Sequence, residues 1–255
     1  MLELKNVCVA AGGGVTDDVK AAGGSEFEII NDVSLTLEDK KIYVITGPNG
    51  GGKTSLAKAI MGIYPVSGGA IFLDGEDVSG KTITERANMG IGYAFQAPTR
   101  FKGLKVRDFL SIAARDNTEK RLYSLLVDVG LCAQDYIDRE LNASFSGGEL
   151  KRVEIASILA RDLRVALFDE PEAGIDLWSF QRLTETFRNL RETTDTTIII
   201  ISHQERILRL ADEVILISGG KVTEITTPDK ILWDIECKNP DCGCVDCFEK
   251  EVAVC

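Results

Sequence analysis

Three short runs of uninterrupted apolar, largely β-branched residues constrain the fold of this 255-residue chain more than any other feature. They span Ile42 to Thr46, Val165 to Phe168 and Thr197 to Ile201. A strand that is apolar on both faces must be buried on both faces, and helical patterns separate these runs along the chain. The runs therefore predict an α/β fold in which helices cover both sides of a parallel sheet.

The remaining patterns predict the elements around this sheet. Strand patterns cover 2–9, 27–37, 70–73 and 91–95, and a hairpin is predicted from 214–217 and 221–225. Helical spacing covers 55–63, 148–161 and 177–190. Helical patterns over 104–141 are broken at Asn117 and Gly130, which indicates a small helical insertion. The glycine-rich stretch 10–26 is typical of a loop.

A glycine-rich segment joins the first apolar run to the next predicted helix. It consists of Gly47, Pro48, Asn49, Gly50, Gly51, Gly52, Lys53 and Thr54, followed by Ser55. The pattern is that of a phosphate-binding loop, in which glycines let backbone N–H groups point at phosphate oxygens and the helix start adds a positive dipole. Lys53 would supply a charge for the β- and γ-phosphates, and the Thr54 hydroxyl would bind Mg²⁺. A plain glycine-rich turn is the alternative, but the flanking elements favour nucleotide binding.

Two carboxylates, Asp169 and Glu170, directly follow the second apolar run. Ligands of α/β sheets bind at the carboxyl ends of the strands. Asp169 would accept from Mg²⁺-bound water, and Glu170 would orient and polarise the water that attacks in line. An acidic pair in this place is also typical of a helix cap or a solvated turn, so this interpretation depends on the phosphate loop.

A third motif, Phe-Ser-Gly-Gly-Glu, spans Phe145 to Glu149 and precedes a predicted helix. In this order with the other two motifs it resembles the signature of ATP-binding cassette (ABC) ATPases, and the match covers residues 1 to about 226. The resemblance implies a P-loop NTPase fold with a RecA-like core of mixed and parallel sheet, an antiparallel β subdomain and a helical subdomain at about 98–150. Residues 227–255 would form a C-terminal extension. By the same resemblance, Ser146, Gly147 and Gly148 would bind the ATP held by an opposing copy, in an ATP-dependent homodimer.

The resemblance implies roles for three more residues. His203 follows the third apolar run and matches the family's switch histidine, which bonds to the γ-phosphate. Gln96 ends a predicted strand and matches the family's metal-sensing glutamine, which implies that it contacts Mg²⁺ and takes part in catalysis. Asp176 ends the loop that couples the two ATP sites, although Glu172 and Ala173 replace the usual hydroxyl-bearing residues there. Phe27 is a candidate for stacking on adenine, but an inward-facing core position fits it better.

The local sequence is similar to the SufC branch of this family, the ATPase of SUF iron–sulfur cluster assembly. Phe145 and Glu149 stand where transporters commonly have Leu and Gln, while the stretch 169–176 departs from the SufC pattern. This similarity implies a SufB/SufD-like scaffold protein as partner. The alternative is the nucleotide-binding subunit of an ABC membrane transporter, whose partner is a membrane permease. A DNA-repair ATPase is disfavoured because the chain has no long coiled-coil insertion.

Composition excludes some classes of function. With 44% hydrophobic residues the chain can build a core, and its net charge of −11 makes nucleic acid an unfavourable partner. The sequence shows neither a signal peptide nor an apolar run of membrane-spanning length, so a cytoplasmic location is expected.

Five of the seven cysteines lie between Cys237 and Cys255. An odd number of cysteines without an export signal disfavours a disulfide framework. Cys237, Cys242, Cys244 and Cys247 could bind Zn²⁺ or an Fe–S cluster, because close thiolates are soft ligands. A reduced, flexible tail explains the same spacing equally well.

Overall fold

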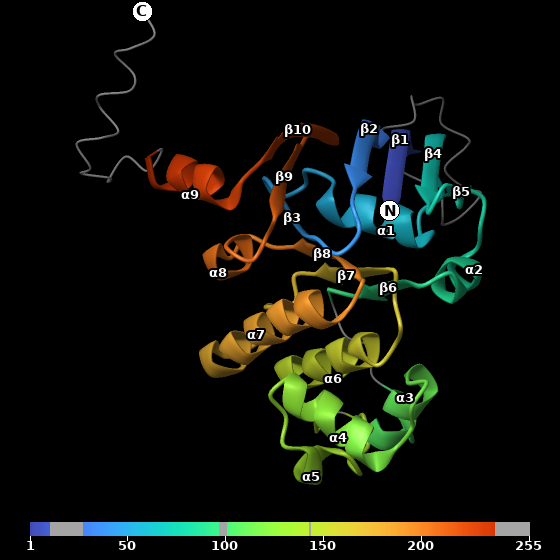
Figure 1. The fold of residues 1–255 in the computed structure, drawn as a ribbon, viewed down its shortest axis with the longest axis vertical. Coiled ribbons are helices and arrows are strands. Elements are labelled where there is room, and N and C mark those ends of the chain that lie inside the picture. Colours follow the sequence, from blue (N-terminus) through green and yellow to red (C-terminus); the bar gives the residue numbers. More distant parts are fainter. Residues whose placement is uncertain (11–27, 97–100, 143, 238–255) are drawn as a thin grey trace, which may run out of the picture.

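The computed structural model describes residues 1–10, 28–96, 101–142 and 144–237, which form two sheets and a set of helices (Figure 1). The described strands are β1 (Leu2–Ala10), β2 (Glu28–Leu37), β3 (Ile42–Thr46), β4 (Gly68–Leu73), β5 (Glu76–Asp77), β6 (Ile91–Ala94), β7 (Val165–Asp169), β8 (Thr197–Ile201), β9 (Glu213–Ser218) and β10 (Lys221–Thr226). The described helices are α1 (Lys53–Met61), α2 (Ile83–Asn88), α3 (Val106–Ala113), α4 (Glu119–Asp128), α5 (Ala133–Tyr136), α6 (Gly147–Leu159), α7 (Leu177–Thr193), α8 (Glu205–Leu208) and α9 (Pro228–Cys237).

The larger sheet has the strand order β10-β9-β3-β8-β7-β6. Its neighbours from β9 to β6 pair in parallel, and only the β9–β10 hairpin is antiparallel. The three apolar runs form β3, β7 and β8, which confirms the predicted parallel sheet. Because β8 lies between β3 and β7, the residues that follow these three strands meet at one edge of the sheet.

Two hydrophobic cores lie on opposite faces of this sheet. Along β8, Ile198 and Ile200 pack into the core under α6 and α7, whereas Ile199 and Ile201 pack into the core that contains α1. Figure 1 shows α1 on one side of β6, β7 and β8, and α6 and α7 on the other. Every side chain of β8 is buried, which explains why its sequence shows no alternation.

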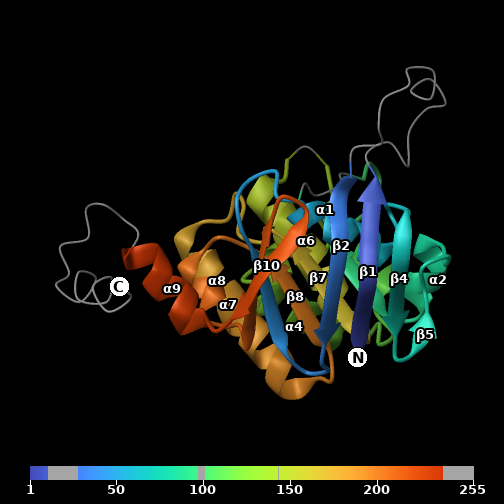
Figure 2. The ribbon, with the colours of Figure 1, turned by 90° about the horizontal axis from the view of Figure 1, so that it is seen from above.

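The smaller sheet is antiparallel, with the order β2-β1-β4-β5. It covers α1, as Figure 2 shows from above. Alternate residues of β1, among them Leu2 and Leu4, are buried in the same core as α1. This sheet is the predicted antiparallel β subdomain. A hydrogen bond of 2.9 Å from the Asn31 N–H to the Gly220 carbonyl oxygen joins β2 to the β9–β10 hairpin.

Helices α3, α4 and α5 form the predicted helical subdomain beside α6 (Figure 1). The predicted breaks are found. Helix α4 begins after Thr118, whose hydroxyl accepts a hydrogen bond from the Arg121 N–H. After α4 the chain turns at Gly130, where φ is +76°, a backbone conformation that favours glycine.

Helices α2, α8 and α9 were not predicted. Helices α2 and α8 are too short to show a helical period. Thr82 and Glu85 nevertheless form a capping box at the start of α2, a signal that could have located it. Helix α9 packs Ile231 and Leu232 into the core under α6 and α7. Among the described residues, no helix has both the length and the apolar character needed to cross a lipid bilayer.

Candidate functional site

The glycine-rich loop between β3 and α1 requires glycine for two reasons. Gly47, Gly50 and Gly52 have φ values of +134°, +77° and +103°, which residues with a Cβ atom rarely adopt. A Cβ atom on Gly47 would lie 2.0 Å from the carbonyl oxygen of Ile217 in β9. The loop therefore curls tightly against β9 and leads into α1, whose first-turn N–H groups have no acceptor within the helix.

Lys53 lies over this loop. Its Nζ atom donates to the carbonyl oxygens of Gly47 at 2.8 Å and Pro48 at 2.9 Å, and the residue is 6% exposed. Burial lowers the pKa of Lys53, while the nearby carboxylates of Glu170 and Asp169 oppose that shift. The loop thus presents an ammonium group and a helix N-terminus at one place, which suits a phosphate group.

Thr54 and Asp169 provide an oxygen pair at the edge of the sheet. The Thr54 Oγ1 donates to Asp169 Oδ1 at 3.1 Å, and the Tyr93 hydroxyl donates to Oδ2 at 2.8 Å. Burial raises the pKa of Asp169, and the two hydrogen bonds oppose the shift. Mg²⁺ binds through few protein oxygens and keeps several waters, so the Thr54 hydroxyl can bind the ion while Asp169 accepts from one of its waters. This oxygen pair therefore fits Mg²⁺.

Glu170 adopts an unusual backbone conformation, with φ of +47°. Such a conformation costs a non-glycine residue about 1–3 kcal/mol, which the surroundings must offset. The Glu170 N–H donates to the Ile201 carbonyl oxygen at 2.9 Å, and Lys151 Nζ donates to the Glu170 carbonyl oxygen. Gln96 Nε2 donates to Glu170 Oε2 at 2.7 Å. The structure therefore brings Gln96 and Glu170 together, as their places at strand ends predict.

Lys151 was missed by the sequence reasoning. It is 1% exposed on α6, and its Nζ also donates to the carbonyl oxygens of Gln96 at 3.1 Å and Asp169 at 3.4 Å. Burial lowers the pKa of Lys151, and the carboxylates around it, Glu172 first, oppose the shift. A lysine among the apolar positions of a buried helix was the available signal. Tyr93 was also missed, because its hydroxyl partner lies 76 residues away.

His203 follows β8 and lies close to the phosphate loop. Its Nδ1 is 3.3 Å from Oγ1 of Thr46, the residue before Gly47. The residue is exposed, but partial desolvation of the ring, together with the positive charge of Lys53, lowers the pKa of His203. The imidazole is therefore neutral near pH 7, when one ring nitrogen donates and the other accepts.

The predicted signature residues begin α6. Ser146 caps this helix, with a hydrogen bond of 3.2 Å from the Glu149 N–H to its hydroxyl and one of 2.7 Å from its own N–H to Glu149 Oε2. Ser146 and Gly147 are exposed. Among the described residues, the stretch 146–148 makes no hydrogen bond with the loop 47–54. The two motifs therefore share no hydrogen bond within the described residues, although both are helix starts suited to phosphate.

Asp176 begins α7. Its side chain accepts from the N–H groups of Trp178 at 3.1 Å and Ser179 at 3.0 Å, and hydrogen bonding to Ser179 holds the pKa of Asp176 below its usual value. Its loop touches the start of α6, since a Cβ on Gly148 would lie 2.4 Å from the Gly174 carbonyl oxygen. The structure shows Asp176 as a helix cap, and its predicted coupling role stays a prediction.

An apolar cavity of about 210 Å³ lies between the end of β6 and the helical subdomain. Its lining includes Phe95, Phe101, Phe109, Leu141, Leu150 and Val153. Phe95 and Phe101 are 42% and 39% exposed. Glu154 also lines it, with one oxygen accepting from the Phe95 N–H at 3.0 Å and the other without a partner among the described residues. Burial raises the pKa of Glu154.

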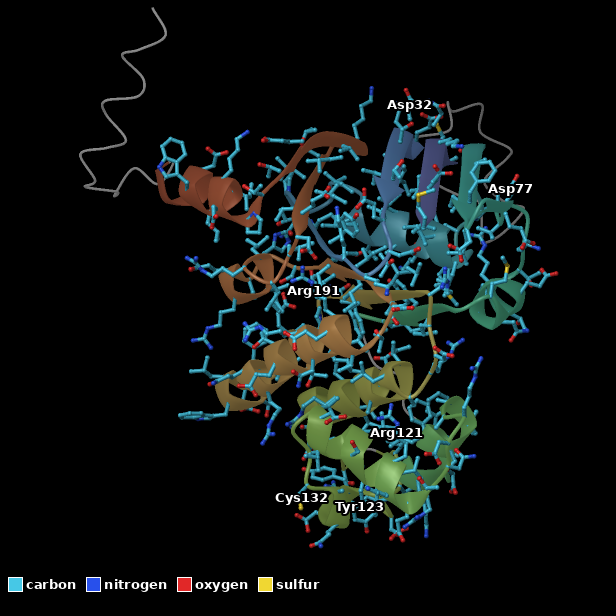
Figure 3. The ribbon with its side chains drawn as sticks, viewed as in Figure 1. Asp32, Asp77, Arg121, Tyr123, Cys132 and Arg191 are labelled. Carbon is cyan, nitrogen blue, oxygen red and sulfur yellow. The ribbon has the colours of Figure 1, made fainter. Side chains whose placement is uncertain are left out.

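Two predicted features fall outside the described side chains. Phe27, Cys242, Cys244 and Cys247 lie beyond the described ranges, and Cys237 is described only as the last residue of α9. Cys8 and Cys132 are free thiols, and Figure 3 shows Cys132 on the helical subdomain. Within the described ranges, no cluster of three or more His, Cys, Asp or Glu side chains could hold a metal ion. A metal site in the tail stays a prediction.

Comparison with known proteins agrees with this geometry. The family model described as ABC transporter matches residues 30–173. The chain is 37% identical to an uncharacterized ABC transporter ATP-binding protein of Methanocaldococcus jannaschii, over 88% of this chain and 90% of that protein. It is 32% identical to the probable ATP-dependent transporter ycf16 of Cyanidium caldarium, over 78% and 85%. It is 31% identical to the sulfate/thiosulfate import ATP-binding protein CysA of Brucella melitensis, but spans only 59% of that protein's length.

Among solved structures, a dimeric ATP-binding cassette in a post-hydrolysis state bound to ADP and phosphate matches with a TM-score of 0.77 and 21% identity, over 89% of this chain and 99% of the other. An ATP-bound bacterial exporter of the Atm1 family matches with a TM-score of 0.76 and 21% identity, over 92% and 40%. At such identities the likeness shows the fold alone. The family model and the more similar relatives carry the conclusion further: the chain belongs to the ABC transporter family and is an ABC-type ATPase.

Proposed function

We propose that two copies of this chain hydrolyse ATP at composite sites, each built from the phosphate loop of one copy and Ser146 to Gly148 of the other. The separation of two phosphate-suited helix starts within one chain carries this proposal. Lys53 and the start of α1 lie at the sheet edge, whereas Ser146 and Gly147 are exposed and make no hydrogen bond with the described loop of their own chain. A second copy can supply the missing half of each site by symmetry.

Within one copy, the loop and Lys53 bind the phosphates. Thr54 Oγ1 would bind Mg²⁺, Asp169 would accept from a water on the ion, and Gln96, which donates to Glu170, would contact the metal site. The bound ion would neutralise charge on the β- and γ-phosphates. Tyr93 keeps Asp169 in place by its hydrogen bond to Oδ2.

Glu170 and His203 act on the hydrolysis step. The Glu170 carboxylate orients and polarises the attacking water, and its left-handed backbone, supported by Lys151, fixes where the carboxylate points. His203 donates a hydrogen bond to the γ-phosphate and stabilises the charge spread over its three equatorial oxygens, while the leaving β-phosphate oxygen takes the electron pair of the broken bond.

The apolar cavity beside Phe95 suits a docking segment of a separate partner protein. Phe95 precedes Gln96, so a segment seated there lies next to the residue that contacts Glu170. Exposed aromatic residues around a pocket are typical of interaction sites. The occupant we propose is an apolar helical segment of the partner.

We propose that this partner is a membrane permease, which the names of the relatives support. A second candidate is a SufB/SufD-like scaffold of iron–sulfur cluster assembly, which Phe145 and Glu149 favour. In the structure, Phe145 is buried against Arg139, and Glu149 completes the cap of α6.

Purification at native expression level distinguishes the two partners. Co-purification of an integral membrane protein with the tagged chain from solubilised membranes supports the transport proposal. Recovery of a soluble scaffold protein contradicts the transport proposal and supports assembly. A Phe95→Asp variant should lose the partner in either case while keeping ATP binding, because a charge in the apolar cavity is costly to bury.

A further inference from the structure

Glu172 stands where the family pattern usually has a hydroxyl-bearing residue, and the structure gives it a definite contact. Its Oε1 accepts a hydrogen bond from the Ser202 hydroxyl at 2.6 Å, across 30 residues of sequence. Its Oε2 is buried and has no partner among the described residues. Burial raises the pKa of Glu172, and the hydrogen bond from Ser202 opposes the shift. A carboxyl oxygen accepts in either protonation state.

Ser202 transmits this contact to the turn that carries His203. Ser202 is fully buried, and its N–H donates to the Ile45 carbonyl oxygen in β3 at 3.2 Å. Its hydroxyl oxygen also accepts from the Gln204 N–H at 3.0 Å, which closes a turn around His203. A hydroxyl has one proton. Because this proton is donated to Glu172, a lone pair of the Ser202 hydroxyl oxygen is left to accept from the Gln204 N–H.

The other side of Glu172 is equally fixed. Its carbonyl oxygen accepts from the Ile175 N–H at 3.1 Å, and the Ala173 N–H donates to the Glu170 carbonyl oxygen at 3.1 Å. The segment from Glu170 to Asp176 is therefore a folded turn that follows β7 directly. Glu172 is the side chain through which this segment reaches the turn after β8.

We propose that Glu172 is a positioning residue, which sets the place of His203 for hydrolysis by holding the Ser202 hydroxyl. The inference rests on the proposed role of His203. It gives a role to Glu172, a position at which this chain departs from the family pattern. The contact with Ser202 connects the loop that ends at Asp176 to the turn that carries His203 within one copy.

The test compares variants in steady-state ATP hydrolysis. Glu172→Ala should lower kcat about 10- to 100-fold with KM changed less than about twofold, because small misplacements of a catalytic group cost this much. Ser202→Ala should cause a similar loss. Glu172→Gln, whose amide oxygen still accepts, should restore kcat to within about threefold. Thr196→Val is the matched control, since it removes a buried hydroxyl bond, to the Leu163 carbonyl oxygen, at the opposite end of β8.

The His203→Ala background makes the test specific. If Glu172 acts through His203, adding Glu172→Ala to His203→Ala should change kcat by less than about twofold, since effects within one network are not additive. Thermal unfolding and nucleotide binding confirm that each variant is folded.

Three results overturn the proposal: a Glu172→Ala protein as active as the Thr196→Val control, a Gln variant as poor as the Ala variant, or independent losses in the double variant. Full activity of His203→Ala alone would instead refute the role of His203 in the proposed function.

Discussion

The carboxyl edge of the larger sheet and the start of α6 are both suited to phosphate, but they differ in how they are held. At the sheet edge, polar side chains from separate elements bind one another. Thr54 in α1 bonds to Asp169 at the end of β7, and Gln96 after β6 bonds to Glu170 after β7. At the start of α6, the Ser146 hydroxyl bonds only to the Glu149 N–H among the described residues, and the residue is exposed.

This difference teaches how a nucleotide site can be divided between molecules. The sheet edge is set by the fold of one chain and is ready to bind. The start of α6 is capped and exposed, and it makes no hydrogen bond with the loop 47–54 among the described residues, so in the proposed composite site it serves the loop of another copy. Substitutions at the two places should therefore fail in different ways.

Removing the charge at the sheet edge should have the largest effect. Lys53→Ala should lower kcat/KM for ATP on the order of 1000-fold, because a positioned ammonium group is lost from a site that develops negative charge. Lys58→Ala is the matched control on the same helix, where the ammonium group lies over the Tyr64 ring, and it should stay within about twofold of wild type. Steady-state hydrolysis measures both, and equal activities would break the assignment of the loop.

Glu170→Gln should separate binding from hydrolysis. Loss of the water-polarising carboxylate should lower kcat about 100- to 1000-fold, while ATP affinity persists and a dimer accumulates. Sedimentation with ATP and Mg²⁺ measures the dimer, and the Lys53→Ala protein, which lacks phosphate binding, should remain monomeric. A Glu170→Gln protein that turns over ATP at the wild-type rate would refute the role of this carboxylate.

Gly148→Ala tests the rigid start of α6. The added Cβ would lie 2.4 Å from the Gly174 carbonyl oxygen, so α6 must move from the Asp176 loop. We expect a loss of about 1–3 kcal/mol in the free energy of unfolding. At Gly147 no atom lies within 4 Å of such a Cβ, and Gly147→Ala should keep the stability of wild type. Chemical denaturation compares the two, and equal stabilities would contradict the close approach.

The smallest effect concerns the cavity beside Phe95. Because burial raises the pKa of Glu154, the folded state binds this proton more tightly than the unfolded state. Stability from the group is then present at low pH and lost as the pH rises from 4.5 through the raised pKa. Relative to Glu154→Gln, wild type should therefore become less stable as the pH rises from 4.5 through the raised pKa of Glu154. Denaturation at several pH values measures this, and a difference independent of pH would contradict it.

Much of the site could be predicted because buried apolar strands and glycine-rich turns are each compatible with few local structures. Gly47 follows β3, Asp169 ends β7 and His203 comes just after β8, and parallel pairing of these strands brings their ends together whatever lies between them. Contacts that depend on a side chain reaching a distant partner could not be predicted. Lys151 donates hydrogen bonds to three carbonyl oxygens, and Glu172 accepts one from the Ser202 hydroxyl. Nothing in their neighbouring sequence specifies those partners.

The most direct test of the composite site mixes two inactive variants, Lys53→Ala and Ser146→Arg. Neither variant can build an intact site from its own copies, but a mixed dimer contains one site made of an intact loop and an intact α6 start. Random pairing of equal amounts would restore at most about a quarter of the wild-type sites, because half of the dimers are mixed and each of these has one intact site of two. ATP hydrolysis should rise on mixing toward that fraction. A mixture no more active than the separate proteins would contradict a site shared between two copies.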